Sequence, residues 1–397
     1  MGLVKTLAGQ FAKIKVIGVG GGGNNAINSM ISEGNFKGVD FISVNTDSQA
    51  LLGSLAPIKV QIGEKLTKGL GAGGNPQIGQ QAAEESKDRI KEILDGTDMV
   101  FITGGMGGGT CTGAAPMIAK IAKKELGILT IAVVTKPFLF EGSRRMTNAE
   151  EGINLLRQCV DTLIVIPNQK VMDVVNNKAT LIEAFKVADS VLNKGTKAIA
   201  DLITIPGLIN LDFADIKTIM SNAGSALMGV GEASGEDKAQ KAVMAAIDSP
   251  LVEVNIEGAR GVLINITGGP DLTMAEIEDA AKTITERTAP DSNIIFGANI
   301  DDKLRDKIKI TVIATGFDAS RPYFHTAPKV VPQNINTNTQ NSSQNTSNFQ
   351  DPRPATKTEP TNINDQQIKQ ILGNEDLPAG VDISDEYDIP AFLRNKK

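Results

Sequence analysis

Residues 104–113 read Gly104-Gly105-Met106-Gly107-Gly108-Gly109-Thr110-Cys111-Thr112-Gly113, and they form the most informative stretch of the chain. A short apolar run, Met99–Thr103, precedes them and predicts a buried strand, and a helical stretch, Ala114–Glu125, follows. Glycines between a strand and a helix let backbone N–H groups approach an anion, and the positive end of the helix adds attraction. The stretch therefore predicts a loop that binds an anion such as a phosphate.

A second glycine-rich loop reads Gly18-Val19-Gly20-Gly21-Gly22-Gly23-Asn24-Asn25 and precedes a helix that we expect to begin near Asn24. Gly18, Gly20 and Gly23 fit the pattern G-x-G-x-x-G, which by itself also suits a Rossmann dinucleotide site. Two anion-binding loops at one sheet edge can hold a triphosphate between them, whereas a Rossmann site uses one loop and an acid for the ribose. The Walker pattern G-x-x-x-x-G-K-[ST] does not occur in the chain, which excludes a P-loop protein.

In the first half of the chain, short apolar runs alternate with helical stretches, which indicates an α/β fold with a parallel sheet. The runs that we predict as strands are Ile14–Val19, Phe41–Val44, Met99–Thr103, Leu129–Val134 and Thr162–Ile166. The turns that follow them are Gly20–Asn25, Asn45-Thr46-Asp47, Gly104–Thr110, Thr135-Lys136-Pro137 and Pro167-Asn168. Because ligands bind beyond the carboxyl ends of parallel strands, these turns predict one shared site.

A long helical pattern over Leu181–Ile203 follows, and Pro206-Gly207 ends it. The next region has a mixed order, which predicts a smaller α+β domain packed on the long helix. Its expected strands lie near Ala226–Val230, Gly261–Thr267, Asn293–Gly297 and Lys307–Thr315, and its expected helices near Asp237–Ile247 and Met274–Arg287.

The last part of the chain has a different composition. Residues Val331–Asn362 are rich in Asn, Gln, Ser, Thr and Pro, which predicts disorder because little apolar surface can be buried. Apolar residues return in Tyr387–Arg394, which suggests a docking peptide on a flexible leash. Apolar residues that occur by chance in a tail are the alternative.

Composition excludes several classes of protein. The net charge is −6 and no dense Lys/Arg block occurs, which argues against nucleic acid as a partner. No apolar run reaches the roughly 18 residues of a membrane span, and no signal peptide precedes the first strand, so we expect a cytoplasmic protein without direct membrane insertion. Met1–Thr6 fits the myristoylation pattern, which often matches by chance. Two cysteines, Cys111 and Cys159, and one histidine, His325, predict neither disulfides nor a protein metal site.

The glycine loops together resemble the tubulin/FtsZ family, and in particular its bacterial cell-division branch. Gly107–Gly113 is similar to the family signature G-G-G-T-G-[ST]-G, with Cys111 where the family usually has glycine. The expected contact there is a backbone N–H, which cysteine retains. The other resembling stretches are Gly18–Asn25, Asn45-Thr46-Asp47, Gly69–Pro76, Thr135-Lys136-Pro137 and Phe140–Arg145. Asn193-Lys194-Gly195-Thr196 is similar to the guanine motif of Ras-like GTPases, but it lacks the acid, and we interpret it as helix surface.

The resemblance implies a domain plan and a nucleotide site. Residues 1–180 would form a Rossmann-like GTP-binding domain, 181–203 a central helix, 204–317 a C-terminal domain for GTPase activation and polymerisation, 318–380 a disordered linker and 381–397 a docking peptide. Asp189 would accept the guanine N–H groups, and Phe185, four residues earlier, would stack on the base. Core packing is the alternative for Phe185.

The remaining nucleotide contacts implied by the resemblance come from the loops. Asn25 would contact the base, and Glu141 and Arg145 would lie near the ribose and the phosphates. The other predicted contacts are Gly20, Gly21, Gly22, Gly23, Asn24, Asn45, Gly73, Asn75, Gly107, Gly108, Gly109, Thr110, Cys111, Thr135, Pro137 and Asn168.

The loop from Pro206 to Asp215 has two interpretations. In one, Asp212 caps a helix that runs through Met220, and Asp215 lies in its first turn. In the other, which the resemblance implies, Asn210, Asp212 and Asp215 enter the GTP site of the next subunit and polarise the attacking water, while Mg²⁺ offsets phosphate charge. Capping and catalysis can coexist, because a carboxylate has several lone pairs.

The resemblance implies a GTPase that polymerises head-to-tail into filaments of the division ring at mid-cell, on the inner face of the membrane. A site divided between two subunits makes contacts that do not close, which generates filaments. The terminal peptide would bind membrane-associated adaptors such as an FtsA-type protein. The alternatives are a tubulin-like filament GTPase for plasmid partition or cell shape, and an NAD-dependent oxidoreductase that uses the first loop.

Overall fold

A single mixed sheet runs through the part of the chain that the computed structural model describes, residues 12–34, 36, 38–170, 180–204, 208–209, 212–248, 256 and 258–317. Its strand order is β3-β2-β1-β4-β5-β6-β7-β10-β8-β9. Several features predicted above lie outside the described residues: the pattern Met1–Thr6, the helix end at Pro206-Gly207, Asn210, the linker 318–380 and the peptide 381–397.

The first six strands are all parallel. They are β1 (Ile14–Val19), β2 (Val39–Asn45), β3 (Ile58–Gln61), β4 (Met99–Gly105), β5 (Leu129–Lys136) and β6 (Thr162–Pro167). Their order, 3-2-1-4-5-6, is that of doubly wound dinucleotide-binding folds. The five strands predicted for this half are confirmed, whereas β3, a short strand at the edge of the sheet, was not predicted.

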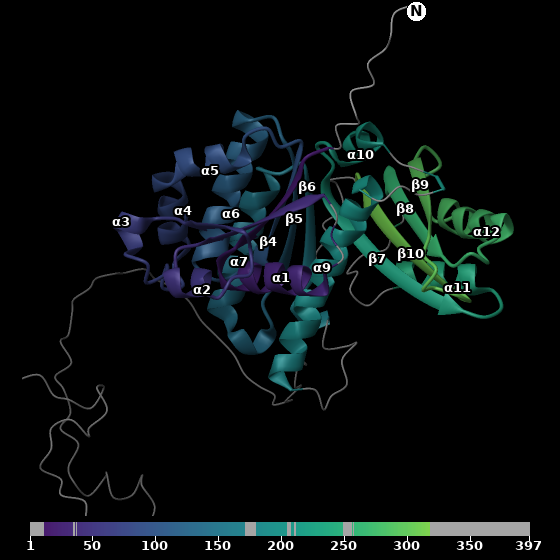
Figure 1. The fold of residues 1–397 in the computed structure, drawn as a ribbon, viewed down its shortest axis with the longest axis horizontal. Coiled ribbons are helices and arrows are strands. Elements are labelled where there is room, and N and C mark those ends of the chain that lie inside the picture. The colour runs from purple at the N-terminus through teal and green to yellow at the C-terminus, as the bar shows by residue number, and fades with distance from the viewer. Residues whose placement is uncertain are drawn as a thin grey trace, which may run out of the picture. The chain divides into compact units, whose positions relative to one another are not determined.

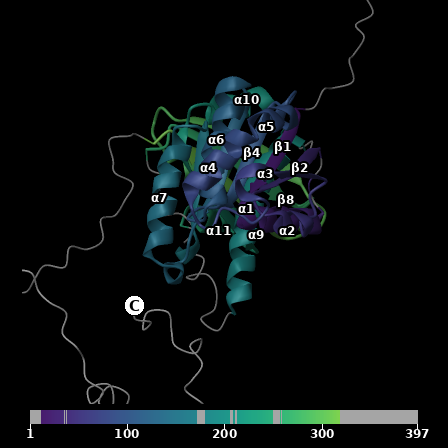
Figure 2. The same ribbon diagram turned by 90° about the vertical axis from the view of Figure 1, so that its left-hand side faces the viewer.

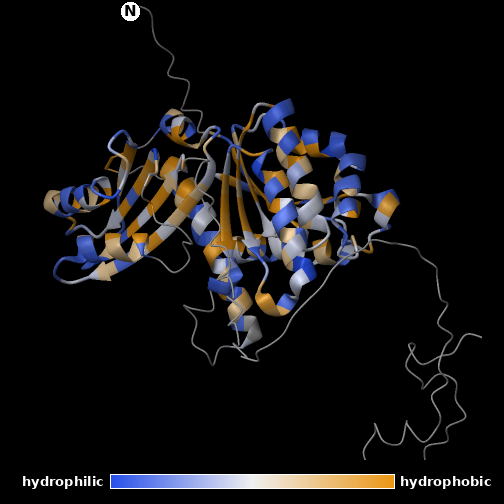
Figure 3. Cartoon of the chain, turned by 180° about the vertical axis from the view of Figure 1, so that it is seen from behind, coloured by the Kyte–Doolittle hydropathy of each residue, from blue (hydrophilic) through white to orange (hydrophobic). Residues whose placement is uncertain are grey.

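Helices cover both faces of this parallel sheet, as Figures 1 and 2 show. Successive residues of each strand point to opposite faces, so each strand contributes to both layers. On β1, Val16 belongs to a core that includes residues of α1 (Gly20–Glu33), α9 (Leu181–Thr204) and α10 (Phe213–Met220). Its neighbour Ile17 belongs to a second core that includes residues of α4 (Pro76–Glu85), α5 (Lys87–Leu94), α6 (Thr110–Lys120) and α7 (Ser143–Arg157). The strands are accordingly coloured as hydrophobic along most of their length in Figure 3. Short helical segments are α2 (Ser48–Leu52), α3 (Glu64–Thr67), a π-helical turn (Ile121–Glu125) and a 3₁₀ turn (Leu139–Glu141).

The C-terminal half continues the sheet with β7 (Gly224–Ser234), which pairs with β6 over only Thr162–Ile164. Strand β10 (Lys307–Thr315) pairs antiparallel with both β7 and β8 (Gly261–Gly268), and β9 (Asn293–Ile300) pairs in parallel with β8. Helices α11 (Lys238–Ile247) and α12 (Met274–Thr285) share a separate core with these strands. The predicted α+β character of this smaller domain is confirmed.

Two helices begin earlier than predicted. Helix α1 begins at Gly20 rather than near Asn24, and α6 begins at Thr110 rather than at Ala114. The glycines and threonine of the loops therefore belong to first helical turns, where the backbone N–H groups have no partner within the helix. This leaves the N–H groups of residues 20–22 and of residues 110–112 available to an anion, whereas the N–H of Gly113 donates to the carbonyl of Gly109 over 3.2 Å.

The interpretation of Asn193–Thr196 as helix surface is wrong. Asn193 is 1% exposed and Thr196 is fully buried, whereas Lys194 remains at the surface. Helix α9 is packed on several sides, because it lies against α1, β5 and the start of β7. Of the helices described, none combines the length and the apolar composition that a membrane crossing needs.

Candidate functional site

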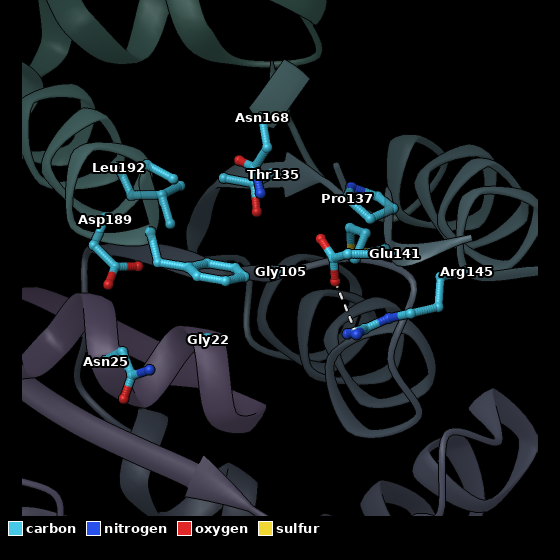
Figure 4. Close-up of a pocket in the computed structure, with 13 residues that line it drawn as sticks. Gly22, Asn25, Gly105, Thr135, Pro137, Glu141, Arg145, Asn168, Asp189 and Leu192 are labelled. Atoms are coloured by element: carbon cyan, nitrogen blue, oxygen red, sulfur yellow. Dashed lines mark ion pairs between the residues drawn. The ribbon is translucent and has the colours of Figure 1, made fainter. Parts of the chain in front are cut away.

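A pocket opens at the carboxyl ends of β4, β5 and β6, where the predicted turns meet the first turn of α1 and the first half of α9. Figure 4 shows Asn25 and Asp189 on one side of it and Glu141 and Arg145 on the other. The predicted site residues that line the pocket are Gly22, Asn25, Thr135, Pro137, Glu141, Arg145, Asn168, Phe185 and Asp189. The structure thus brings together residues from five separate segments of the chain.

Four further residues line the pocket without having been predicted as contacts: Gly105, Met106, Ala188 and Leu192. Gly105 and Met106 belong to the loop quoted at the outset, so their position was a usable signal. Ala188 and Leu192 follow Phe185 by three and seven residues, which places them on the same face of α9. Helical spacing from Phe185 and Asp189 was therefore enough to find them.

The two glycine-rich segments lie against each other beside this pocket. A Cβ atom on Gly22 would lie 3.3 Å from the backbone nitrogen of Gly105, and one on Gly20 would lie 3.3 Å from that of Cys111. A Cβ on Gly23, in the first of the two segments, would lie only 2.7 Å from the carbonyl oxygen of Thr103 at the end of β4. At Gly23 the backbones approach more closely than a side chain permits, and at Gly20 and Gly22 a side chain would be crowded.

Two other predicted loops reach the same place. The hydroxyl oxygens of Thr46 and Thr110 are 2.7 Å apart, which ties the turn after β2 to the start of α6. A Cβ on Gly109 would lie 2.9 Å from the backbone nitrogen of Asn75, so the loop with Gly73 and Asn75 packs on the signature loop. The other predicted contacts near the pocket, Gly21, Asn24, Asn45, Gly107, Gly108 and Cys111, belong to these same segments but do not line it.

Cys111 turns its side chain away from the pocket and into the core. Its sulfur lies 3.8 Å from the sulfur of Met106, and burial raises the pKa of the Cys111 thiol to about 12. The thiol is therefore neutral and unreactive at physiological pH. The backbone nitrogen of Cys111 faces the neighbouring loop at Gly20, as the predicted N–H contact requires.

The side of the pocket formed by α9 has the character of a base-binding wall. Phe185 is 40% exposed, so core packing does not account for its side chain. Burial raises the pKa of the Asp189 carboxyl to about 6. A partly desolvated carboxylate at this position is a strong acceptor for a pair of N–H groups, which guanine presents and adenine does not.

The opposite side carries an ion pair. An oxygen of Glu141 lies 2.8 Å from the guanidinium of Arg145, and its other oxygen accepts a hydrogen bond of 2.9 Å from the backbone N–H of Phe138. Glu141 is therefore held at both oxygens, while Arg145 keeps donors free to bind an anion.

Asp212 and Asp215 form a capping box at the start of α10. The backbone N–H of Asp215 donates to Asp212 over 2.7 Å, and that of Asp212 donates to Asp215 over 3.4 Å. The predicted cap is confirmed. Each carboxylate keeps one oxygen that this box does not use.

The structure does not bring these two carboxylates to the pocket of their own chain. Both carboxylates follow the end of α9, which is Thr204. Along the axis of α9, Thr204 lies fifteen residues and about 22 Å from Asp189. In Figure 1, α10 lies at the top of the view and α9 reaches the bottom.

The segment before Asp212 is fastened to the edge of the C-terminal sheet. Ile209 forms an antiparallel bridge with Ala298 of β9, and the backbone N–H of Leu208 donates to the carbonyl of Ala298 over 2.9 Å. The side chain of Ile209 packs against the core of the C-terminal domain. On the other side, α10 buries Ile216, Ile219 and Met220. Asp212 therefore lies between two anchored segments, the bridge to β9 before it and the packed helix α10 after it.

Comparison with known proteins identifies both halves of the chain. Residues 13–176 match the family model "Tubulin/FtsZ family, GTPase domain", and residues 224–318 match "FtsZ family, C-terminal domain". An FtsZ from M. jannaschii, solved as an empty dimer, is 49% identical, with a TM-score of 0.73 over 77% of this chain and 88% of that one.

Two further structures have the same fold. A point mutant of the M. jannaschii FtsZ is also 49% identical, with a TM-score of 0.74 over 77% of this chain and 92% of that one. CetZ2 from Haloferax volcanii, in a GTPγS-bound protofilament, is 19% identical, with a TM-score of 0.66 over 77% and 94% of the two chains, and shares the fold alone. The GTPase match disfavours the oxidoreductase alternative. The chain therefore belongs to the FtsZ family of tubulin-like, GTP-binding cell-division proteins.

Proposed function

We propose that this protein hydrolyses GTP in sites shared between successive subunits of a head-to-tail filament, and that the filaments build the division ring. The observation that carries the proposal is that Asp212 and Asp215 do not line the pocket of their own chain and follow the far end of α9, where Thr204 lies about 22 Å along the helix axis from Asp189. Carboxylates so placed can act on a bound nucleotide only from another copy. One surface then binds a different surface of the next copy, and such contacts do not close.

The pocket would hold GTP with the base against Phe185 and Asp189, and the phosphates between the first turn of α1 and the signature loop. Asn25 would add a base contact, and Arg145 would bind a phosphate or the ribose. The remaining predicted contacts would act through backbone N–H groups of the loops. These donors are fixed before the nucleotide arrives, which favours stabilisation of the charge that develops during phosphoryl transfer.

Hydrolysis would require the next subunit. Asn210, Asp212 and Asp215 of that subunit would orient the attacking water, and a carboxylate oxygen left free by the capping box would accept its hydrogen bond. Water would attack the γ-phosphorus as the bond to the β-phosphate oxygen breaks. Activity would thus depend on assembly.

Mg²⁺ fits this site as an ion bound mainly by the nucleotide. Among the described residues, no three His, Cys, Asp or Glu side chains gather as a metal-binding group. Mg²⁺ in such sites is bound by phosphate oxygens and water, with few protein ligands. Its contribution would be to neutralise phosphate charge.

The domain plan follows from the same proposal. Residues 1–180 would bind GTP, 204–317 would activate the neighbour and support polymerisation, and the helix 181–203 would connect them. Residues 318–380 would be a linker, and 381–397 would dock on a membrane-associated adaptor such as an FtsA-type protein, on the inner face of the membrane at mid-cell. The printed sequence of the peptide, with Tyr387, Ile389 and Phe392 after a polar stretch, supports that role.

GTP turnover per subunit is expected to rise steeply with protein concentration, because each working site needs two copies. Phosphate release and light scattering should be measured in parallel across a dilution series. Turnover per subunit should increase at the concentration where scattering begins. A turnover that stays constant below and above that concentration would show that one chain hydrolyses GTP alone.

Deletion of Asp388–Lys397 is expected to leave GTP turnover and filament formation unchanged, because these residues lie beyond the whole of the described fold. Binding to membrane-attached adaptor should be lost. The measurement is co-sedimentation with adaptor-coated vesicles, with filament formation followed in the same samples. A truncated chain that fails to polymerise would assign the peptide to the filament instead.

A further inference from the structure

Phe138 is a fully buried aromatic side chain directly behind the pocket, and the proposed function gives it no role. Its ring lies 5.3 Å from that of Phe185, centroid to centroid, at an interplanar angle of 87°. An edge-to-face pair of this kind is favourable and depends on orientation. Phe138 therefore restrains the ring that forms the base-binding wall.

Phe138 also contacts a second aromatic ring. Phe140 stacks on Phe138 at 5.0 Å with an angle of 14°, and it is 61% exposed. Phe138 thus contacts one exposed ring, that of Phe140, and one ring that lines the pocket, that of Phe185. Because Phe138 is fully buried and contacts two aromatic rings, its own orientation is restrained, and it can restrain Phe185 in turn.

The backbone of Phe138 is fixed by the opposite wall of the pocket. Its N–H donates to Glu141, which pairs with Arg145, and its carbonyl accepts a bond of 3.1 Å from the N–H of Glu141. The next residue, Leu139, donates to the side chain of Gln169 beyond the end of β6. One residue thus touches both walls: its backbone holds the side with the ion pair, and its ring holds the base side.

We infer that Phe138 is a positioning residue for the nucleotide base, acting through Phe185. The inference rests on the proposed site, because it takes Phe185 to contact the base. A side-chain substitution at Phe138 keeps the backbone hydrogen bonds to Glu141. It therefore changes the support of the base wall and leaves the phosphate loops as they are.

Phe138→Leu is expected to weaken the binding of GDP by about three- to tenfold, the range that corresponds to loss of one aromatic pair. Calorimetric titration of the full chain with GDP gives this value, and GDP avoids turnover during the measurement. Binding of pyrophosphate, which has no base, should be unchanged. A general loss of structure in the pocket would weaken the binding of both GDP and pyrophosphate, and that result would overturn the inference.

Phe101→Leu is the matched control. Phe101 is a fully buried phenylalanine on β4 that does not line the pocket. Both substitutions remove a similar amount of buried aromatic surface and should lower the melting temperature. Only Phe138→Leu should weaken GDP binding. Equal GDP affinities in the two variants would contradict the positioning role.

A double-mutant cycle tests whether Phe138 acts through Phe185. If it does, the variant that combines Phe138→Leu with Phe185→Leu should bind GDP no more weakly than Phe185→Leu alone. Additive losses would overturn the inference, because Phe138 would then act by another route. If the unsubstituted chain failed to bind GDP, that result would contradict the proposed function itself. Normal GDP binding by the unsubstituted chain and by Phe138→Leu would refute the inference alone.

Discussion

Asp212→Asn is expected to bind GTP as tightly as the unsubstituted chain and to hydrolyse it at least about 100-fold more slowly. Asparagine caps helices about as well as aspartate, so the hydrogen bond to the N–H of Asp215 should survive. The negative charge that orients the attacking water is lost. Nucleotide binding should be measured below the concentration at which filaments form, and phosphate release above it.

Two controls separate the loss of charge from the loss of the cap. Thermal unfolding should show little change for Asp212→Asn, whereas Asp212→Ala should lose about 1 kcal/mol because the cap is removed. Thr273 caps α12 with the same box and lies in no predicted site, so Thr273→Ala should cost similar stability and leave turnover intact. If Asp212→Asn hydrolysed GTP at the normal rate, Asp212 would act only as a helix cap.

Mixing the variant with the unsubstituted chain tests whether the site is shared. An Asp212→Asn subunit would disable the pocket of its neighbour rather than its own. Turnover per unsubstituted subunit should therefore fall as variant is added. If that turnover stays constant while the two chains demonstrably co-assemble, each subunit hydrolyses its own GTP.

Asp189→Ala is expected to reduce the preference for GTP over ATP by roughly 10- to 100-fold, since a bidentate contact to a base contributes about 1–3 kcal/mol of discrimination. Competition of the two nucleotides for the pocket measures the ratio. The pH dependence gives a second readout. The pKa of Asp189 is raised to about 6, so GTP affinity should fall as the pH drops through 6 and the acceptor is protonated.

The same pKa shift sets the sign of an effect on the empty protein. A carboxyl whose pKa is higher in the folded than in the unfolded state stabilises the fold at low pH, and this contribution is lost as the pH rises through about 6. Asp189→Asn should therefore raise the melting temperature of the nucleotide-free chain at pH 7 more than at pH 4. Equal shifts at both pH values, with an unchanged GTP/ATP ratio, would remove Asp189 from the base wall.

Local sequence patterns predicted most of the parallel sheet, because its strands are buried on both faces and appear as continuous apolar runs. Strand β3 escaped, since Ile58 and Lys59 are exposed and only Val60 is buried. Such a short edge strand depends on pairing with β2, which no local pattern reports. The starts of α1 and α6 were placed too late because glycine has low helix propensity, whereas the close packing of the two loops overrides it.

The pocket was partly predictable for a similar reason. The loops that end each strand gave most of its lining, and the spacing along α9 linked Phe185 with Asp189. Phe138 was not found, because it stands next to Leu139 and Phe140 and the sequence does not say which of the three is buried. The structure shows that Phe138 is fully buried and that its neighbours are 68% and 61% exposed. Likewise, the polar side chains of Asn193 and Thr196 concealed the burial of that part of α9.

Under the proposed function, the bridge between Ile209 and Ala298 has a consequence for how the protein can evolve. The position of Asp212 is set by β9 and α10, neither of which contributes to the pocket. The residues with which a subunit would activate its neighbour and the residues with which it would bind its own nucleotide are therefore encoded in different stretches of the gene. Substitutions near Ala298 can retune the lifetime of GTP in the filament while the affinity of each monomer for GTP stays the same. Selection can adjust the two traits independently.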